Sequence, residues 1–270
     1  MRPNDLQFLA AFVRDRTGIV LDESKQYLLE ARLTPLLREA GLADIAALCE
    51  RLRAPGAMAL KSKVVDAMTT NETSFYRDGA PFELLRTEVL PELVNRRSAG
   101  RRLAIWSAAC SSGQEPYTLA MILRDSFPHI GGWDVSITAT DVSEAMVERC
   151  QKGLFSEYEL SRGLTAEQRD RHFHRTKDGG WQAREELRRM VKVRTLNLLQ
   201  PLPTEFRFDL VLIRNVLIYF DESTKEAILR RVRGVLAPDG YLMLGTAETP
   251  RGDAFVRATS SRTMLYRPAA

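Results

Sequence analysis

LAIWSAACSSGQEPYTLAM, residues 103–121, indicates the fold class of this chain. An apolar run typical of a buried strand leads into a loop of small residues, and an amphipathic helix follows at once. Because little side chain lies between Ser107 and Gly113, a flat adenosine-like ligand could rest against the main chain there. In open α/β sheets such loops follow the carboxyl ends of strands, where nucleotides bind. An ordinary tight connection between strand and helix has the same pattern.

A second segment, residues 134–140 (DVSITAT), favours the nucleotide interpretation. It alternates and is rich in β-branched residues, as strands are, and it delivers Asp141 just before a helix that Ser143 can cap. An acidic side chain at the end of the second strand of such a fold accepts hydrogen bonds from ribose hydroxyls. The position also suits an acidic residue beside a helix N-terminus, and Asp141 can have both roles.

The loop also indicates which nucleotide-like ligand is expected. It has one glycine, Gly113, so the phosphate-binding patterns GxGxxG and GxxxxGK[ST] are both missing. Glu115, in the first turn of the helix, would repel phosphate and attract an ammonium or sulfonium group. The segment therefore predicts S-adenosylmethionine as the cofactor.

The composition is that of an ordinary globular protein: 270 residues, 44% hydrophobic and 27% charged, enough for one large domain and one small one. The three cysteines and three histidines are scattered, so we expect neither a disulfide framework nor a metal site. Neither an apolar run of about 18 residues nor a signal peptide is evident. We therefore expect a cytoplasmic protein without membrane insertion.

The hydrophobic pattern divides the chain near residue 70. Before that point only helices are expected, at residues 5–16, from 24 up to Gly41, at 44–53 and at 57–68. From about residue 75 strands alternate with helices, which implies a mostly parallel sheet. Strands are expected at residues 103–108, 134–140, 191–196, 208–213, 241–245 and 263–267, with a helix at 222–236 that ends at a Pro-Asp-Gly turn. We therefore predict an all-helical unit, residues 1–71, before an α/β unit, residues 72–270.

One stretch, residues 165–195, is expected to form an insertion in the α/β unit. Lys177-Asp178-Gly179-Gly180 is a hairpin turn pattern between two short candidate strands. The stretch has nine Lys and Arg against five Asp and Glu, a net charge of +4 that equals the formal charge of the whole chain. Such a charge pattern is typical of a solvated surface ribbon, and it would also favour binding of an acidic partner.

Five motifs occur in the order in which one enzyme family has them: MTTNETSFYRD (68–78), SAACSSGQEPYTLA (107–120), ATD (139–141), LNLL (196–199) and FDLVLIRNVLIYFD (208–221). Through them the chain resembles the chemotaxis receptor glutamate methyltransferases of the CheR type. The resemblance implies a Rossmann-like, S-adenosylmethionine-dependent methyltransferase domain with a reversed last strand and a small inserted antiparallel β-subdomain, preceded by a small all-α N-terminal domain.

The resemblance also implies the reaction. A glutamate side chain of the receptor attacks the methyl group, giving a glutamyl methyl ester and S-adenosylhomocysteine in sensory adaptation. Glutamate, with a pKa of about 4.3, is ionised at neutral pH and needs no general base. The enzyme must supply an in-line approach at about 3 to 3.5 Å and a dry site.

Arg77 and Tyr219 are the predicted catalytic residues. By resemblance Asn71, Thr73 and Arg77 lie over the cofactor, and Tyr219 faces the methyl group. Arg77 can hold a carboxylate through its planar fork, while Tyr219 can donate one hydrogen bond and exclude water. A surface arginine in a linker and a core tyrosine after a strand are the alternatives.

The remaining cofactor contacts also follow from the resemblance. They are Glu115 for the methionine ammonium, Asp141 for the ribose, Asn197 and Leu198 for the adenine, and Arg214 and Asn215 for the methionine portion. Asn197 and Leu198 could instead be ordinary residues at a strand end. Cys110 has no histidine motif to partner it, so we do not expect a thiol nucleophile.

The expected partner is the cytoplasmic helical domain of methyl-accepting chemoreceptors. Residues 24–63 have seven Lys and Arg against four Asp and Glu, so the helical unit is the candidate docking domain, although scattered surface charge has the same pattern. In the family the β-subdomain can bind a pentapeptide at a receptor's C-terminus. The turn at 177–180 is shorter than in members that do so, which predicts independence of this tether, although Arg184, Arg188 and Arg189 are candidate contacts.

Two other functions are each compatible with part of the sequence. A nucleic-acid methyltransferase would suit the pI near 9.0, but the chain has no Asn-Pro-Pro-Tyr-like or Pro-Cys motif and no basic stretch rich in aromatic residues, so no nucleic-acid partner is expected. A non-catalytic cofactor-binding module would be expected to have lost Arg77 or Tyr219, and both are present.

Overall fold

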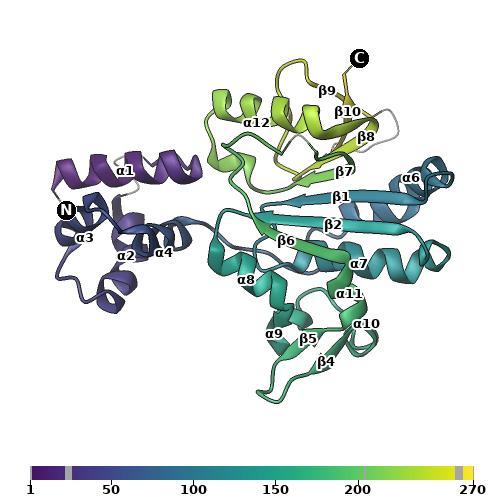
Figure 1. Cartoon of the computed structure of the whole chain (residues 1–270), viewed down its shortest axis with the longest axis horizontal. Coiled ribbons are helices and arrows are strands. Elements are labelled where there is room, and N and C mark those ends of the chain that lie inside the picture. Colours follow the sequence, from purple (N-terminus) through teal and green to yellow (C-terminus); the bar gives the residue numbers. More distant parts are fainter. Residues whose placement is uncertain (1, 22–25, 204, 259–263, 270) are drawn as a thin grey trace.

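The chain folds into a helical unit beside a large sheet that has helices on its two faces (Figure 1). The computed structural model describes residues 2–21, 26–203, 205–258 and 264–269. The helical unit consists of α1 (Pro3–Thr17), α2 (Gln26–Glu39), α3 (Ile45–Arg53) and α4 (Met58–Met68). Gly18 ends α1 in the left-handed region, with φ of 76°, and Asp44 caps α3 by accepting from the N–H of Ala47. All four expected helices are thus present, although the expected start of the second, Ser24, lies outside the described residues.

The large sheet has seven strands in the order β6-β2-β1-β7-β8-β10-β9. They are β1 (Arg102–Ala108), β2 (Asp134–Asp141), β6 (Val191–Thr195), β7 (Phe208–Ile213), β8 (Leu236–Leu244), β9 (Phe255–Arg257) and β10 (Leu265–Pro268). The pairs from β6 to β8 are parallel, and β10 is antiparallel to β8. The mostly parallel sheet and its reversed late strand are confirmed. β10 covers residues 265–268 where a strand at 263–267 was expected, and Thr263 lies outside the described residues.

Strand β1 is buried on both faces, which explains its continuous apolar run. Leu103 and Ile105 belong to the core that holds α7 (Gln114–Ser126) and the helical segment of residues 80–97. Ala104 and Trp106 face the opposite core, under α12 (Glu222–Val235). Residues 80–97 form α5 (Ala80–Leu84), the π-helical turn η2 (Leu85–Val89) and α6 (Leu90–Arg97), while η3 (Pro128–Ile130) and η4 (Leu217–Tyr219) are short 3₁₀ turns.

Two strand predictions differ from the structure. β8 begins at Leu236 rather than Tyr241, so the expected Pro-Asp-Gly turn lies within it. Opposite this stretch the register of the sheet shifts between Phe208 and Leu210. The shift accommodates the extra residues of β8, Pro238 to Gly240 among them, without ending the strand. β9 was not expected, because three residues at a sheet edge carry no readable alternation.

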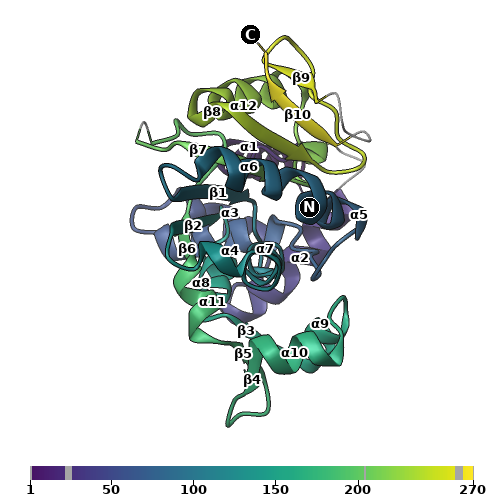
Figure 2. The same cartoon turned by 90° about the vertical axis from the view of Figure 1, so that its right-hand side faces the viewer.

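A small antiparallel sheet in the order β3-β5-β4 lies apart from the large one (Figure 2). It contains β3 (Leu154–Phe155), β4 (Phe173–Arg175) and β5 (Trp181–Ala183), and α9 (Glu157–Ser161) and α10 (Ala166–His172) lie beside it. Two further helices, α8 (Glu144–Lys152) and α11 (Glu185–Met190), pack against β2 and β6 of the large sheet. The expected hairpin is present, but the range 165–195 needs correction at both ends. β3 precedes it, and β6, which the range includes, pairs with β2 in the large sheet. A two-residue strand has no pattern to read, and the alternation of β6 does not say which sheet it joins.

Candidate active site

A cavity opens at the carboxyl ends of β1, β2 and β7, between the sheet and the helical unit. It encloses about 950 Å³ of empty space, part of which is open to solvent. All ten residues predicted as site residues line it: Asn71, Thr73, Arg77, Glu115, Asp141, Asn197, Leu198, Arg214, Asn215 and Tyr219. The structure thus brings together positions from five separate motifs.

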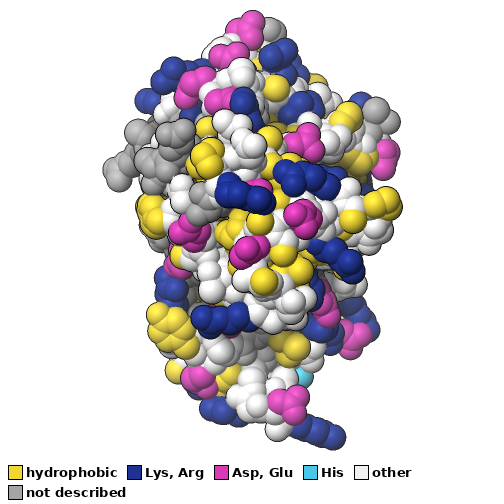
Figure 3. Space-filling model, turned by 90° about the vertical axis from the view of Figure 1, so that its left-hand side faces the viewer, with side chains coloured by type: hydrophobic (Ala, Val, Ile, Leu, Met, Phe, Trp, Pro, Cys, Tyr) yellow, Lys and Arg dark blue, Asp and Glu magenta, His cyan; other side chains and the backbone are white. Residues whose placement is uncertain are grey.

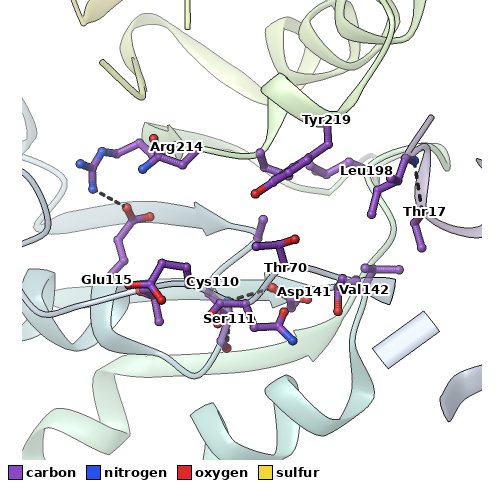
Figure 4. Close-up of a pocket in the computed structure, with 18 of the residues that line it drawn as sticks. Thr17, Thr70, Cys110, Ser111, Glu115, Asp141, Val142, Leu198, Arg214 and Tyr219 are labelled. Atoms are coloured by element: carbon purple, nitrogen blue, oxygen red, sulfur yellow. Dashed lines mark hydrogen bonds and ion pairs between the residues drawn. The ribbon is translucent and has the colours of Figure 1, made fainter. Parts of the chain in front are cut away.

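Asp141 fixes the loop after β1. One carboxylate oxygen accepts from the N–H of Ser111 at 2.8 Å (Figure 4). The other accepts from the N–H of Ser143, the N-cap of α8, at 2.9 Å. Burial raises the pKa of the Asp141 carboxyl, and these N–H groups oppose the rise. Ala109 and Ser111 both have positive φ, 55° and 50°, so the loop has a conformation that needs such support.

Gly113 ends this loop and allows close packing beneath it. Its φ is 103°, and a Cβ there would lie 2.8 Å from the Sγ of Cys150. The neighbouring Cys150 thiol and burial both raise the pKa of the Cys110 thiol well above its usual value. A thiol held in its neutral form is a poor nucleophile, in agreement with the expectation for Cys110.

Arg214 joins Glu115 to the segment before α5. Its side chain is 2% exposed, and its Nη1 donates to Glu115 at 2.9 Å. Nη2 donates to the carboxylate of Asp78 at 2.8 Å and to the carbonyl of Arg77 at 2.9 Å. Glu115 also accepts from the hydroxyl of Ser107, at 2.8 Å. Glu115 therefore lines the cavity as half of a buried ion pair, a contact that its spacing in the sequence did not indicate.

Arg77 sits in a turn of unusual backbone conformation. Tyr76 and Asp78, on either side, have φ of 50° and 70°. The Nη1 of Arg77 donates to the carbonyl of Glu72 at 2.6 Å, and Arg77 is one of the residues that line the cavity. Such strained backbone clusters at functional sites, where the surrounding structure holds it in place.

Tyr219 enters the cavity from the opposite side, on η4 after β7 (Figure 4). Its hydroxyl points into the cavity, and it makes no hydrogen bond with the residues that the structure describes. Asn215 begins this loop with φ of 58°. A donor that faces an open cavity is available to a bound molecule.

The helical unit supplies part of the cavity wall, which the sequence did not predict. Thr17 and Ile19, at the end of α1, line the cavity. Asn197 connects the two units, because its Nδ2 donates to the carbonyl of Arg16 at 2.7 Å and its Oδ1 accepts from the N–H of Leu199 at 2.9 Å. No motif pointed to Thr17 or Ile19, since they reach the site only through this docking.

Comparisons with known proteins agree with this architecture. Residues 71–263 match the family described as CheR methyltransferase, SAM binding domain, and residues 4–69 match the CheR methyltransferase all-alpha domain. The chain belongs to the CheR methyltransferase family. The resemblance read from the five motifs is confirmed, as are the fold class and S-adenosylmethionine as the cofactor.

Relatives extend over almost the full length. The chain is 40% identical to the chemotaxis protein methyltransferase Cher2 of Pseudomonas putida and 40% identical to chemotaxis protein methyltransferase 1 of Pseudomonas aeruginosa, each over 97% of both chains. It is 35% identical to the chemotaxis protein methyltransferase of Escherichia coli, over 89% of this chain and 82% of that protein. Within the described residues no helix is long and apolar enough to cross a membrane, and no group of three or more His, Cys, Asp or Glu could hold a metal ion.

Proposed function

We propose that this enzyme transfers the methyl group of S-adenosylmethionine to glutamate side chains of bacterial chemoreceptors, in the cytoplasm. The supporting observation is the pairing, in one cavity, of two well-bonded carboxylates with two donors, Arg77 and Tyr219, that remain available. A site built to receive a cation on one side and a carboxylate on the other has this arrangement of charge. Among the described residues that line the cavity there is no histidine or lysine to serve as a general base, and an ionised glutamate needs none.

The sheet side of the cavity fits the cofactor. Asp141 uses one site on each oxygen for backbone N–H groups, and an ionised carboxylate has about four acceptor sites, so two remain for ribose hydroxyls. Glu115 retains capacity for an ammonium in the same way. When bound, S-adenosylmethionine supplies an activated methyl group. We assign the adenine side to Asn197 and Leu198, and the methionine side to Glu115, Arg214 and Asn215.

The opposite side fits the receptor carboxylate. The Arg77 guanidinium has five N–H donors, and only its Nη1 group donates to the carbonyl of Glu72. The N–H groups on its other nitrogens leave a planar edge that can orient a carboxylate. Tyr219 adds one donor and covers the reacting atoms with its ring, which excludes water. The carboxylate oxygen then forms the new bond to the methyl carbon while the carbon–sulfur bond breaks, giving an ester and a neutral thioether. Asn71 and Thr73 complete this side over the cofactor.

The helical unit is the proposed docking domain for the receptor. Its exposed end, seen in Figure 3, mixes Lys and Arg with acidic and apolar side chains rather than presenting one positive patch. Arg32 contributes to structure rather than docking, because it donates to the carbonyls of Met68 and Thr69 and to the hydroxyl of Thr70. Arg38, Arg51 and Arg53 are the candidate contacts for an acidic receptor helix.

We further propose that the enzyme does not need a C-terminal receptor pentapeptide. The β4–β5 turn is closed tightly, since the N–H of Thr176 donates to the carbonyl of Gly180 at 2.9 Å and that of Gly179 donates to Thr176 at 3.1 Å. Such a turn leaves little room for gripping a terminal carboxylate. Calorimetric titration of the free pentapeptide should show no saturable binding, and binding in the micromolar range contradicts the proposal.

The reaction is tested with methyl-labelled S-adenosylmethionine and receptor-containing membranes. We expect the receptor to become labelled and alkali to release the label, because carboxyl methyl esters hydrolyse in alkali whereas N-methyl and ether groups survive. Parallel reactions contain RNA or DNA, or the Arg77→Ala variant, and should stay at background. Alkali-stable label, or label in the nucleic acid, contradicts the proposal.

A further inference from the structure

Glu248 lies in the loop after β8, away from every motif described above, and is 5% exposed. Its carboxylate accepts hydrogen bonds from five backbone N–H groups. They belong to Gly245 (2.8 Å) and Asn215 (2.8 Å) on Oε2, and to Val216 (2.9 Å), Leu217 (2.7 Å) and Ile218 (3.3 Å) on Oε1. Within the described residues no Lys, Arg or His forms an ion pair with it. Backbone dipoles therefore stabilise its charge.

The sheet explains why this carboxylate reaches the catalytic loop. β7 and β8 are parallel neighbours, with Ile213 opposite Leu244, so the loops that follow them begin side by side. A Cβ at Gly245 would lie 2.6 Å from Oε2 of Glu248 and 2.8 Å from Oδ1 of Asn215. Glycine at this position thus permits the approach.

The loop that Glu248 binds is the one that carries Tyr219. Four consecutive N–H groups, from Asn215 to Ile218, point to one carboxylate, and Tyr219 follows directly. Asn215 has φ of 58°, a conformation that a non-glycine residue keeps only when its surroundings hold it. Without the carboxylate these N–H groups would lose their acceptor, and the loop could adopt other conformations.

We propose that Glu248 is a positioning residue for methyl transfer: it sets the backbone of residues 215–218 and thereby the place of the Tyr219 side chain in the cavity. This inference rests on the role proposed above for Tyr219. Arg214 retains its own partners, Glu115 and Asp78, so among the residues assigned to the cofactor only Asn215 is bonded directly to Glu248.

Glu248→Gln tests the inference, because it replaces one acceptor oxygen by an NH₂ group that faces N–H donors. In the full-length enzyme we expect kcat for receptor methylation to fall about tenfold or more, while the apparent KM for S-adenosylmethionine changes less than about threefold. Hydrogen exchange should be faster at the amides of residues 215–218. Glu248→Asp, which keeps the charge, should have a kcat between those of Glu248→Gln and wild type. If Glu248→Gln does not fold, the kcat of Glu248→Asp is compared with wild type instead.

Asp209→Asn is the matched control. Asp209 is also buried, at 8% exposed, and accepts from the N–H of Ala104 at 2.8 Å, but it lies at the opposite end of β7. This variant should lose stability without a comparable loss of kcat per folded enzyme. Combined with Tyr219→Phe, Glu248→Gln should give a less than additive effect on kcat.

Three results overturn the inference: kcat of Glu248→Gln within about twofold of wild type, full additivity with Tyr219→Phe, or unchanged exchange at residues 215–218. Failure of the proposed function would be recognised separately, because the wild-type enzyme would then form no alkali-labile ester on the receptor. The exchange measurement remains readable in that case, since it needs no turnover.

Discussion

The two sides of the cavity are built in opposite ways. On the sheet side, Glu115 and Asp141 are buried or nearly so, and both oxygens of each carboxylate have a donor. On the opposite side, Arg77 and Tyr219 are half-buried and keep donors that no described residue accepts from. The sheet side is therefore preorganised for a ligand held in a single pose. The other side retains hydrogen-bonding capacity for a second substrate.

Arg214 joins the two sides, and its loss should have the largest effect. Arg214→Leu leaves the carboxylates of Glu115 and Asp78 without their cation, and breaking a buried pair costs about 3–5 kcal/mol of unfolding free energy. Urea denaturation measures this loss. Arg86→Leu, which breaks the exposed pair with Glu83, is the matched control and should cost less than about 1 kcal/mol. Equal losses in the two variants would show that Arg214 does not join the sides.

Asp141→Ala should weaken the sheet side. Each hydrogen bond to a charged acceptor contributes about 1.5–3 kcal/mol, so affinity for S-adenosylhomocysteine should fall about ten- to a hundredfold. Asp141→Asn keeps one acceptor oxygen, so its affinity for S-adenosylhomocysteine should lie between those of Asp141→Ala and wild type. Calorimetry on the folded variants is the measurement, and unchanged affinity would remove Asp141 from the site.

Changes on the opposite side should separate turnover from cofactor binding. Arg77→Ala and Tyr219→Phe each remove a donor aimed at the receptor carboxylate, so turnover at saturating cofactor should fall about tenfold or more in both variants. Affinity for S-adenosylhomocysteine should be nearly unchanged in Tyr219→Phe, whereas Arg77, which lies over the cofactor, can affect both quantities. Arg77→Lys should recover turnover only in part, because an ammonium lacks the planar fork. Near-normal turnover in either single variant contradicts the proposed geometry.

Gly18→Ala tests how the helical unit closes the cavity. Gly18 has φ of 76°, and a Cβ there would lie 2.8 Å from the ring of Phe220. We expect a loss of about 1–3 kcal/mol in stability and weaker cofactor binding, because Thr17 and Ile19 are adjacent. Gly41→Ala has the same kind of backbone strain, with φ of 64°, and no atom within 4 Å, so it should lose stability only. Equal cofactor affinity in both variants would mean that α1 does not shape the site.

Charge reversal on the helical unit should have the smallest effect. Changing Arg38, Arg51 and Arg53 together to Glu should raise the apparent KM for receptor, more at low salt than at high salt, and leave cofactor affinity unchanged. Steady-state kinetics at two ionic strengths measure this. Equal kinetics for variant and wild type would identify these arginines as ordinary surface charge.

Local patterns made the sheet side predictable. Asp141 follows a strand and precedes a capped helix, and the small loop before Glu115 stands between a strand and a helix, so a few neighbouring residues define each position. The opposite side was placed by motif resemblance. The limits of the β-subdomain were missed because β3 is two residues long and because alternation in β6 does not identify its partner strand.

The sequence by itself determined the two units, the parallel sheet, the cofactor loop and the family, because helix and strand periods, turn residues and contiguous motifs are read along the chain. The tertiary structure alone decided which of these residues meet. Arg214 binds Glu115 and Asp78 across 99 and 136 positions, Glu248 reaches a loop about 30 residues away, and Thr17 lines the cavity only because α1 docks there. Such contacts depend on how distant segments pack in three dimensions, and local periodicity does not encode that packing.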